Sequence, residues 1–118
     1  MNKTIIITGV TGGVGSEIAK HFISKKWIVF GLSRNLIKLQ KLHEEINNEN
    51  FNVIETDVGN YKSVQSAFEK INQNVDLLIN NASIFLSKPF KISSFEEIDN
   101  IIDTNLKGTI FCTLECLK

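Results

Sequence analysis

The sequence predicts an α/β fold in which helices cover both faces of a parallel β-sheet. Short runs rich in β-branched residues alternate with segments whose apolar residues recur at helical spacing. The links between them are short, so the chain must form right-handed strand–helix–strand units within one sheet. A third observation is the glycine-rich stretch TGVTGGVG at residues 8–15, which lies between the first strand and the first helix.

Length and composition favour a single domain over residues 1–118. Thirteen basic and thirteen acidic residues give a net charge of zero, which argues against a nucleic-acid or membrane-surface partner. We find no transmembrane segment and no signal-peptide pattern, so we expect a cytoplasmic protein. Cys112 and Cys116 are too few for a zinc site or a disulfide framework, and we predict no metal site. At helical spacing they are expected to be two small buried apolar side chains.

The N-terminal half alternates regularly between short apolar runs typical of strands and apolar residues at helical spacing. Residues 3–8 form a short, nearly continuous apolar run, which is typical of a strand buried on both faces. A first helix is marked by Ile18, Ala19, Phe22 and Ile23, and a second by Leu36, Leu39, Leu42 and Ile46. The expected segments are a strand at 3–8, a helix at 16–26, a strand at 27–32, a helix at 36–46 and a strand at 51–55.

The C-terminal half supplies a third helix, a fourth strand and a long last helix. Val64, Ala67, Phe68 and Ile71 mark the third helix, and Tyr61 is expected in the linker that leads into it. The fourth strand is expected at 75–79, followed by a looser segment at 80–94. Ser94 and Glu97 resemble a capping box. The last helix is expected to carry Ile98, Ile101, Ile102, Leu106 and Ile110.

These elements predict a doubly wound sheet with the strand order 3-2-1-4. The connection from the third to the fourth strand should cross the first strand, which places a switch point between strands one and four. Ligands of such sheets bind at the carboxyl ends of the strands beside this point.

The glycine-rich stretch follows the first strand directly. Glycines there permit positive φ and close approach of a ligand, and the next helix directs free N–H groups toward an anion. The spacing is T-G-x-x-x-G-x-G rather than G-x-G-x-x-G, because residue 18 is isoleucine. Taken alone, the stretch could also be a strand-to-helix turn that binds nothing.

Four stretches meet at the carboxyl ends of the expected strands, and together they resemble the short-chain dehydrogenase/reductase family. They are residues 8–15, Ser33-Arg34, Asp57-Val58 and the NNAS sequence at 80–83. The family usually has glycine where this chain has Ser83, a small residue that should be tolerated. The resemblance implies a Rossmann-like, NAD(P)-binding domain over residues 1–118, incomplete relative to the family.

The resemblance also implies roles for individual residues. Asp57 would accept a hydrogen bond from the adenine amino group, although it could instead cap the third helix. Asn80 and Asn81 would tie loops to the sheet and position the cofactor ribose, or could be simple turn residues. Asn105, in the last helix, matches the family's catalytic asparagine. The residues expected to bind the cofactor are Gly9, Thr11, Gly12, Gly13, Val14, Gly15, Ser33, Arg34, Asp57, Val58, Asn81, Ala82 and Ser83.

Arg34 bears on which dinucleotide is bound. A carboxylate about twenty residues after the glycines would hold a ribose 2′-hydroxyl, but residues 31–35 contain none. A guanidinium pairs with a 2′-phosphate, so NADP(H) is favoured over NAD(H). The alternative is that Arg34 is an exposed loop arginine.

The resemblance implies an oxidoreductase that transfers hydride between nicotinamide and a carbonyl or alcohol substrate. The family's catalytic serine and Y-x-x-x-K pair are absent, because the only tyrosine, Tyr61, is followed four residues later by Gln65. We therefore expect a shortened chain that is inactive alone. The alternatives are a non-catalytic nucleotide-binding module and a non-functional remnant. The apolar line of the last helix and the edge of the fourth strand suggest a homo-oligomer.

Overall fold

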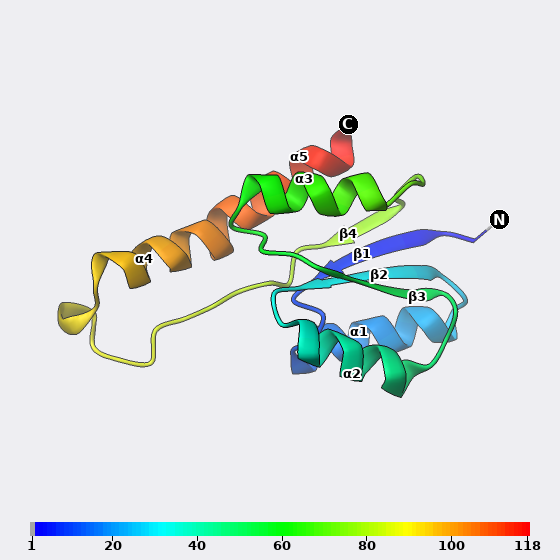
Figure 1. The fold of residues 1–118 in the computed structure, drawn as a ribbon, viewed down its shortest axis with the longest axis horizontal. Coiled ribbons are helices and arrows are strands. Elements are labelled where there is room, and N and C mark those ends of the chain that lie inside the picture. The colour runs from blue at the N-terminus through cyan, green and yellow to red at the C-terminus, as the bar shows by residue number, and fades with distance from the viewer. Residues whose placement is uncertain (1) are drawn as a thin grey trace.

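The computed structural model describes residues 2–118 as four strands with helices between them (Figure 1). Most of the elements lie where the sequence predicts them. In chain order they are β1 (Thr4–Thr8), α1 (Gly13–Ser24), β2 (Ile28–Ser33), α2 (Leu36–Ile46), β3 (Phe51–Glu55), α3 (Tyr61–Lys70), β4 (Leu77–Ile79), the 3₁₀ helix η1 (Phe90–Ile92), α4 (Phe95–Ile102), the π-helical turn η2 (Asp103–Lys107) and α5 (Gly108–Leu117).

The four strands form one parallel sheet in the order β3-β2-β1-β4, which confirms the predicted topology. Ile7 of β1 pairs with Gly31 of β2 on one side and with Ile79 of β4 on the other. Helices α1 and α2 cover one face, and α3 and α5 cover the other (Figure 1). The carboxyl ends of β1 and β4 therefore lie side by side at the switch point.

The core consists of two apolar layers, one on each face of the sheet. All five residues of β1 are buried. Ile5 and Ile7 pack with Leu39 of α2 on one face, whereas Ile6 packs with Ala67 of α3 on the other. Alternate side chains of a strand point to opposite faces, so the continuous apolar run of β1 serves both layers.

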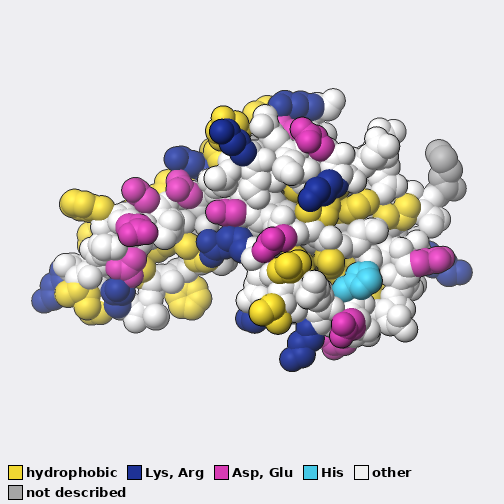
Figure 2. All heavy atoms as spheres, in the orientation of Figure 1, with side chains coloured by type: hydrophobic (Ala, Val, Ile, Leu, Met, Phe, Trp, Pro, Cys, Tyr) yellow, Lys and Arg dark blue, Asp and Glu magenta, His cyan; other side chains and the backbone are white. Residues whose placement is uncertain are grey.

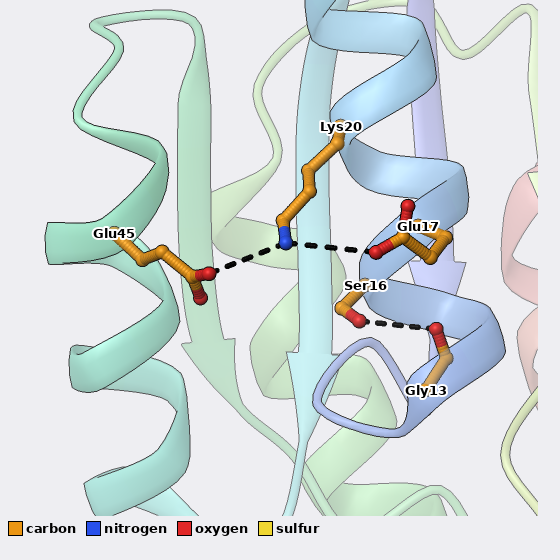
Figure 3. Close-up of polar contacts among 5 residues, drawn as sticks. All are labelled: Gly13, Ser16, Glu17, Lys20 and Glu45. Carbon is orange, nitrogen blue, oxygen red and sulfur yellow. Dashed lines mark hydrogen bonds and ion pairs between the residues drawn. The ribbon is translucent and has the colours of Figure 1, made fainter.

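An ion-pair group joins the two helices on one face of the sheet. The Lys20 amino group of α1 lies 3.3 Å from a carboxylate oxygen of Glu45 of α2 and 3.6 Å from one of Glu17 (Figure 3). The hydrogen bond to Glu45 and its charge are the main causes that raise the pKa of Lys20. All three side chains are well exposed, so we expect only a small contribution to stability.

Several predicted element boundaries need correction, and the first is that of α1, which covers Gly13–Ser24 rather than 16–26. The strand β4 starts at Leu77 rather than Val75, because Asp76 uses its carboxylate to accept the Thr4 backbone N–H at 2.8 Å. Tyr61 is the first residue of α3, not part of a linker, since the side chain of Asn60 caps the helix there. The last helix is not a single α-helix: the π-helical turn η2 separates α4 from α5.

Of two predictions about the last helix, the capping box is confirmed, whereas the burial of both cysteines is confirmed for only one of them. The capping box at Ser94 and Glu97 is present, and a hydrogen bond with Lys88 followed by those with Ser94 lowers the pKa of Glu97 to about 2. Cys112 is buried, and this burial raises the pKa of its thiol to about 12, so the thiol stays protonated at neutral pH. Cys116 is only partly buried, contrary to the prediction of two buried cysteines.

The C-terminal helical segment carries a row of exposed apolar side chains. Helix α4 and the loop before it extend away from the sheet (Figure 1), and hydrophobic side chains gather on this extension (Figure 2). Among residues 2–118, no helix is both long enough and apolar enough to span a membrane. The exposed row starts at the last residue of α4 and continues along η2 and α5. It consists of Ile102, Leu106, Ile110, Leu114 and Leu117.

Candidate functional site

A cleft of about 890 Å³ lies at the carboxyl ends of the strands. Its walls come from the segments that follow β1, β2, β3 and β4, so all four predicted stretches contribute to it. Three predicted site residues, Gly15, Asp57 and Asn105, do not line it. The predicted residues that do are Gly9, Thr11, Gly12, Gly13, Val14, Ser33, Arg34, Val58, Asn81, Ala82 and Ser83.

Helix α1 begins at this cleft without a side-chain cap. The side chains of Asn35, Asn60 and Ser94 accept backbone N–H groups at the starts of α2, α3 and α4. At α1 the cap position is Gly12, and no side chain in residues 2–118 caps the helix. The first N–H groups of a helix have no intrahelical acceptor, so α1 offers free donors and the positive end of its dipole to the cleft.

The glycines of residues 9–15 differ in what surrounds them. Gly9 has φ of +63°, and a Cβ there would lie 2.8 Å from the Ala82 Cα. A Cβ on Gly15 would collide with the Gly9 carbonyl oxygen. Around Gly13, by contrast, a Cβ would meet no described atom within 4 Å. Protein packing therefore requires glycine at 9 and 15, whereas the space at Gly13 opens into the cleft.

Thr8, at the end of β1, fixes the loop that follows β4. Its Oγ1 accepts the backbone N–H groups of Asn81 and Ala82, each at 2.9 Å. The Asn81 side-chain amide donates to the Gly9 carbonyl oxygen at 3.1 Å. The Asn81 side chain thus ties the loop after β4 to the glycine-rich loop, whereas the amide of Asn80 donates to Thr113 Oγ1 at 3.3 Å. Sequence reasoning gave Thr8 no such role, although it begins the glycine motif.

A second hydrogen-bonded group forms the wall after β2. The hydroxyl oxygens of Thr11 and Ser33 share a hydrogen bond of 3.0 Å, and Ser33 Oγ also accepts the Asn35 backbone N–H. Arg34 lies at the cleft beside them. Lys38, in the first turn of α2, lines the same wall and was missed, because the helical pattern alone does not show which side chains reach a cleft. The other lining residues that were missed are Leu32, Asn35, Leu36, Ile37, Thr56, Ile84 and Thr104.

The Asp57 side chain lies just outside the cleft lining. Its Oδ1 accepts the Gly59 backbone N–H at 3.0 Å, and its own backbone N–H donates to Ser63 Oγ at 2.9 Å. Since Asn60 caps α3, the alternative interpretation of Asp57 as the cap of that helix is wrong. Its neighbour Val58 is buried and lines the cleft.

Asn105 holds the loop after β4 against the last helical segment. Its Oδ1 accepts the Ile84 backbone N–H at 2.8 Å, and its Nδ2 donates to the Ile84 carbonyl oxygen at 2.7 Å. Asn105 belongs to η2, and π-helical turns are frequent at functional sites. Thr104 of the same turn is buried and lines the cleft, as Ile84 does. The Asn105 side chain therefore supports a wall of the cleft.

Comparison with known proteins gives one consistent family. The sequence model of the short chain dehydrogenases matches residues 3–118. NADP-dependent 3-hydroxy acid dehydrogenase YdfG of Escherichia coli is 31% identical over 113 residues, which cover 92% of this chain and 45% of that protein. An uncharacterized oxidoreductase of Staphylococcus aureus is 31% identical over 115 residues, covering 93% of this chain and 49% of that protein.

Solved structures agree with this result. The closed form of serine dehydrogenase complexed with NADP⁺ superposes with a TM-score of 0.87 at 30% identity, covering 97% of this chain and 47% of that one. A short chain dehydrogenase from Bacillus anthracis gives 0.88 at 29% identity, with 95% and 48% covered. The chain spans about half the length of the relatives that it matches. With its family match, its sheet order and its glycine motif, the chain belongs to the short chain dehydrogenase family.

Proposed function

We propose that this chain is the NADP(H)-binding portion of an oxidoreductase that transfers hydride between nicotinamide and a carbonyl or alcohol substrate. The observation that carries the proposal is the uncapped start of α1 at the glycine-rich loop, within a cleft at the switch point. Such helix starts bind phosphate groups. The relative named as NADP-dependent and the neighbour solved with NADP⁺ support the same cofactor.

The residues around the cleft fit a dinucleotide. The free N–H groups at the start of α1, with Thr11, would hold the pyrophosphate where Gly13 leaves open space. Val58, which lines the cleft next to Asp57, would contact the adenine, and residues 81–83, which also line it, would contact the ribose on the nicotinamide side. The bound cofactor supplies or accepts the hydride, while this chain binds and orients it. We assign Asn105 to positioning the loop at Ile84.

A non-catalytic nucleotide-binding module is the second candidate. The described residues that line the cleft include no histidine, tyrosine, cysteine or carboxylate, so they offer no acid–base group that titrates near neutral pH. A module would bind dinucleotide without turnover, whereas a non-functional remnant would not bind it at all. A titration with NADP⁺ therefore separates the remnant from the other two. The cytoplasmic location stays a prediction.

We predict that the chain binds NADP(H) more tightly than NAD(H), and that Arg34→Ala removes most of the difference. Arg34 lines the cleft, and no ion pair of Arg34 is found within residues 2–118. A charge-assisted contact to a 2′-phosphate is worth roughly 1–3 kcal/mol. Fluorescence titrations with NADPH and NADH measure both affinities. Lys70→Ala, at the last turn of α3, is the control and should change neither. Equal affinity for both cofactors in the unmutated chain would contradict the prediction.

We also propose that the chain forms homo-oligomers through its exposed apolar row, which includes Leu106 and Ile110. Contiguous exposed apolar surface of this kind favours association, and β4 is an edge strand of the sheet that residues 2–118 form. Light scattering at micromolar concentration should show dimers or larger species, and Ile110→Glu should shift them toward monomer. Ile37→Glu changes an exposed side chain on α2 and should leave the mass unchanged. A monomer that unfolds cooperatively would argue against this surface.

A further inference from the structure

The π-helical turn η2 meets the loop after β3 at both of its ends. At its start, a Cβ on Gly59 would lie 3.0 Å from the carbonyl carbon and from the Cβ of Asp103. Just past its end, a Cβ on Gly108 would lie 2.7 Å from Val58 Cγ2. Gly108 also donates its backbone N–H to the Asp103 carbonyl oxygen, which is the bond that spans the turn. Two neighbouring residues of the loop therefore pack against the two residues that this bond joins.

Glycine is needed on one side of each contact. The atoms nearest to Gly59 are backbone and Cβ atoms of Asp103, which cannot turn aside. The atom nearest to Gly108 is a methyl carbon of Val58, which is buried in the same apolar cluster as Cys112 of α5. Gly108 lies within a helical segment, where alanine is the better helix former, so the lack of space explains the glycine. Alanine at either position would push η2 away from the loop after β3.

The turn that is held in this way supplies part of the cleft wall. Turns of this kind are rare and occur mostly as single turns within α-helices, frequently at functional sites. Thr104, the second residue of η2, is buried and lines the cleft. Asn105, the third, makes two hydrogen bonds with Ile84 of the loop after β4. A displacement of the turn would therefore move Thr104 and the Asn105–Ile84 pair together.

We propose that Gly59 and Gly108 are positioning residues for the cleft, because their lack of side chains lets the loop after β3 hold η2 where Asn105 binds the loop after β4. The functional part of this inference rests on the proposed function. Neither glycine lines the cleft, so each acts through Thr104 and Asn105. The walls formed by the two loops and by η2 then keep a fixed spacing, and a binding site needs such support to hold its geometry.

The first test follows the Asn105–Ile84 pair by NMR in the chain without ligand. Gly108→Ala should shift the signals of the Ile84 backbone amide and of the Asn105 side-chain amide. It should also speed exchange of the Ile84 amide hydrogen at least about 10-fold, because the pair is weakened. Val58→Ala removes the methyl carbon at 2.7 Å, so its addition to Gly108→Ala should restore most of both signals. Such a cycle of single and double variants isolates the contact between the two residues.

Gly59→Ala is the matched variant for this cycle. It should disturb the same two amide signals, because its methyl group would meet Asp103. Val58→Ala leaves Asp103 in place, so it should rescue Gly108→Ala but not Gly59→Ala. A general loss of stability would not produce rescue of one glycine variant and not of the other. Rescue of both variants, or of neither, would contradict the inference.

Calorimetric titrations with NADP⁺ connect the turn to the proposed function. Gly108→Ala should weaken NADP⁺ binding about 3- to 10-fold, because two walls of the cleft move. Val58 lines the cleft itself, so the double variant is compared with Val58→Ala rather than with the unmutated chain. In that background, Gly108→Ala should change the affinity by less than about 2-fold. If Gly108→Ala does not fold, the double variant must still fold and show native signals of Asn105 and Ile84, or the inference is wrong.

The outcomes separate this inference from the proposed function. If Gly108→Ala lowers only the melting temperature and leaves the amide signals and the NADP⁺ affinity unchanged, Gly108 is a packing residue. The inference is then wrong and the proposed function stands. If the unmutated chain does not bind NADP⁺, the proposed function fails together with the functional part of the inference. The NMR cycle still decides in that case whether the two glycines position the turn.

Discussion

The 118-residue chain alone is expected to oxidise NADPH no faster than the background when ketones or aldehydes are supplied. Reduction of a carbonyl needs a proton donor within hydrogen-bond reach of the substrate oxygen, about 3 Å away, with a pKa near the working pH. Among residues 2–118, the side chains that line the cleft include only two charged ones, those of Arg34 and Lys38. Asn105 carries an amide, which does not supply a proton at neutral pH. Loss of acid–base catalysis alone removes a factor of roughly 10²–10⁴.

Tyr61 is the first side chain to test as the proton donor, because it is the only tyrosine in the sequence. It starts α3 and its ring lies edge-on to Phe111, with centroids 6.3 Å apart. It is not among the residues that line the cleft. An assay that follows NADPH absorbance with a panel of carbonyl compounds should therefore give the same background rate for the unmutated chain and for Tyr61→Phe.

Binding measured on the same samples is the control for this assay. If NADPH binds and is not oxidised, the chain holds the cofactor without the catalytic groups. Turnover that Tyr61→Phe abolishes would identify Tyr61 as the acid and contradict the prediction. Turnover that survives in Tyr61→Phe would mean that the acid lies elsewhere, or that a second chain completes the site.

The fold could be predicted because its signals are local. The continuous apolar run of β1 reflects a strand that is buried on both faces of the sheet. The helical spacing of apolar residues in α2 reflects a helix that buries one of its faces. The boundaries that were missed depend on distant or polar partners. Asp76 lies outside β4 because its carboxylate accepts the backbone N–H of Thr4, which is 72 residues away in the sequence. The first turn of α3 starts with the polar cap Asn60 and shows no apolar spacing.

The candidate site was predictable only in part for a similar reason. Parallel strands place their carboxyl ends at one edge, so the stretches that follow them must meet. That rule identified Arg34 and Asn81, which immediately follow strands or lie near their ends. Lys38 and Thr104 come from within helical turns, and their approach to the cleft depends on tertiary packing. The bidentate contact of Asn105 with Ile84 joins residues 21 apart and has no signature in the sequence.

Gly15→Ala should destabilise the chain strongly, by about 3 kcal/mol or more. The added methyl group would collide with the Gly9 carbonyl oxygen and lie 2.9 Å from the Val10 Cα, and backbone atoms cannot move away as a flexible side chain can. Domains of this size are stable by only about 5–15 kcal/mol, so the loss is a large fraction of the total. Urea unfolding followed by circular dichroism measures it, with a lower midpoint at unchanged slope as the expected result.

Gly13→Ala is the matched variant, because its methyl group would meet no described atom within 4 Å. Alanine is the better helix former, so the ligand-free chain should keep its stability or gain up to about 1 kcal/mol. The methyl group would, however, fill space at the start of α1 that a pyrophosphate needs for close approach. We therefore expect at least about a 10-fold loss of NADPH affinity, corresponding to about 1.4 kcal/mol. Packing alone cannot explain a variant that folds as well as the unmutated chain and binds more weakly. If Gly13→Ala folds normally and binds NADPH with unchanged affinity, the phosphate does not lie at the start of α1. The uncapped start of α1 would then no longer support the proposed function.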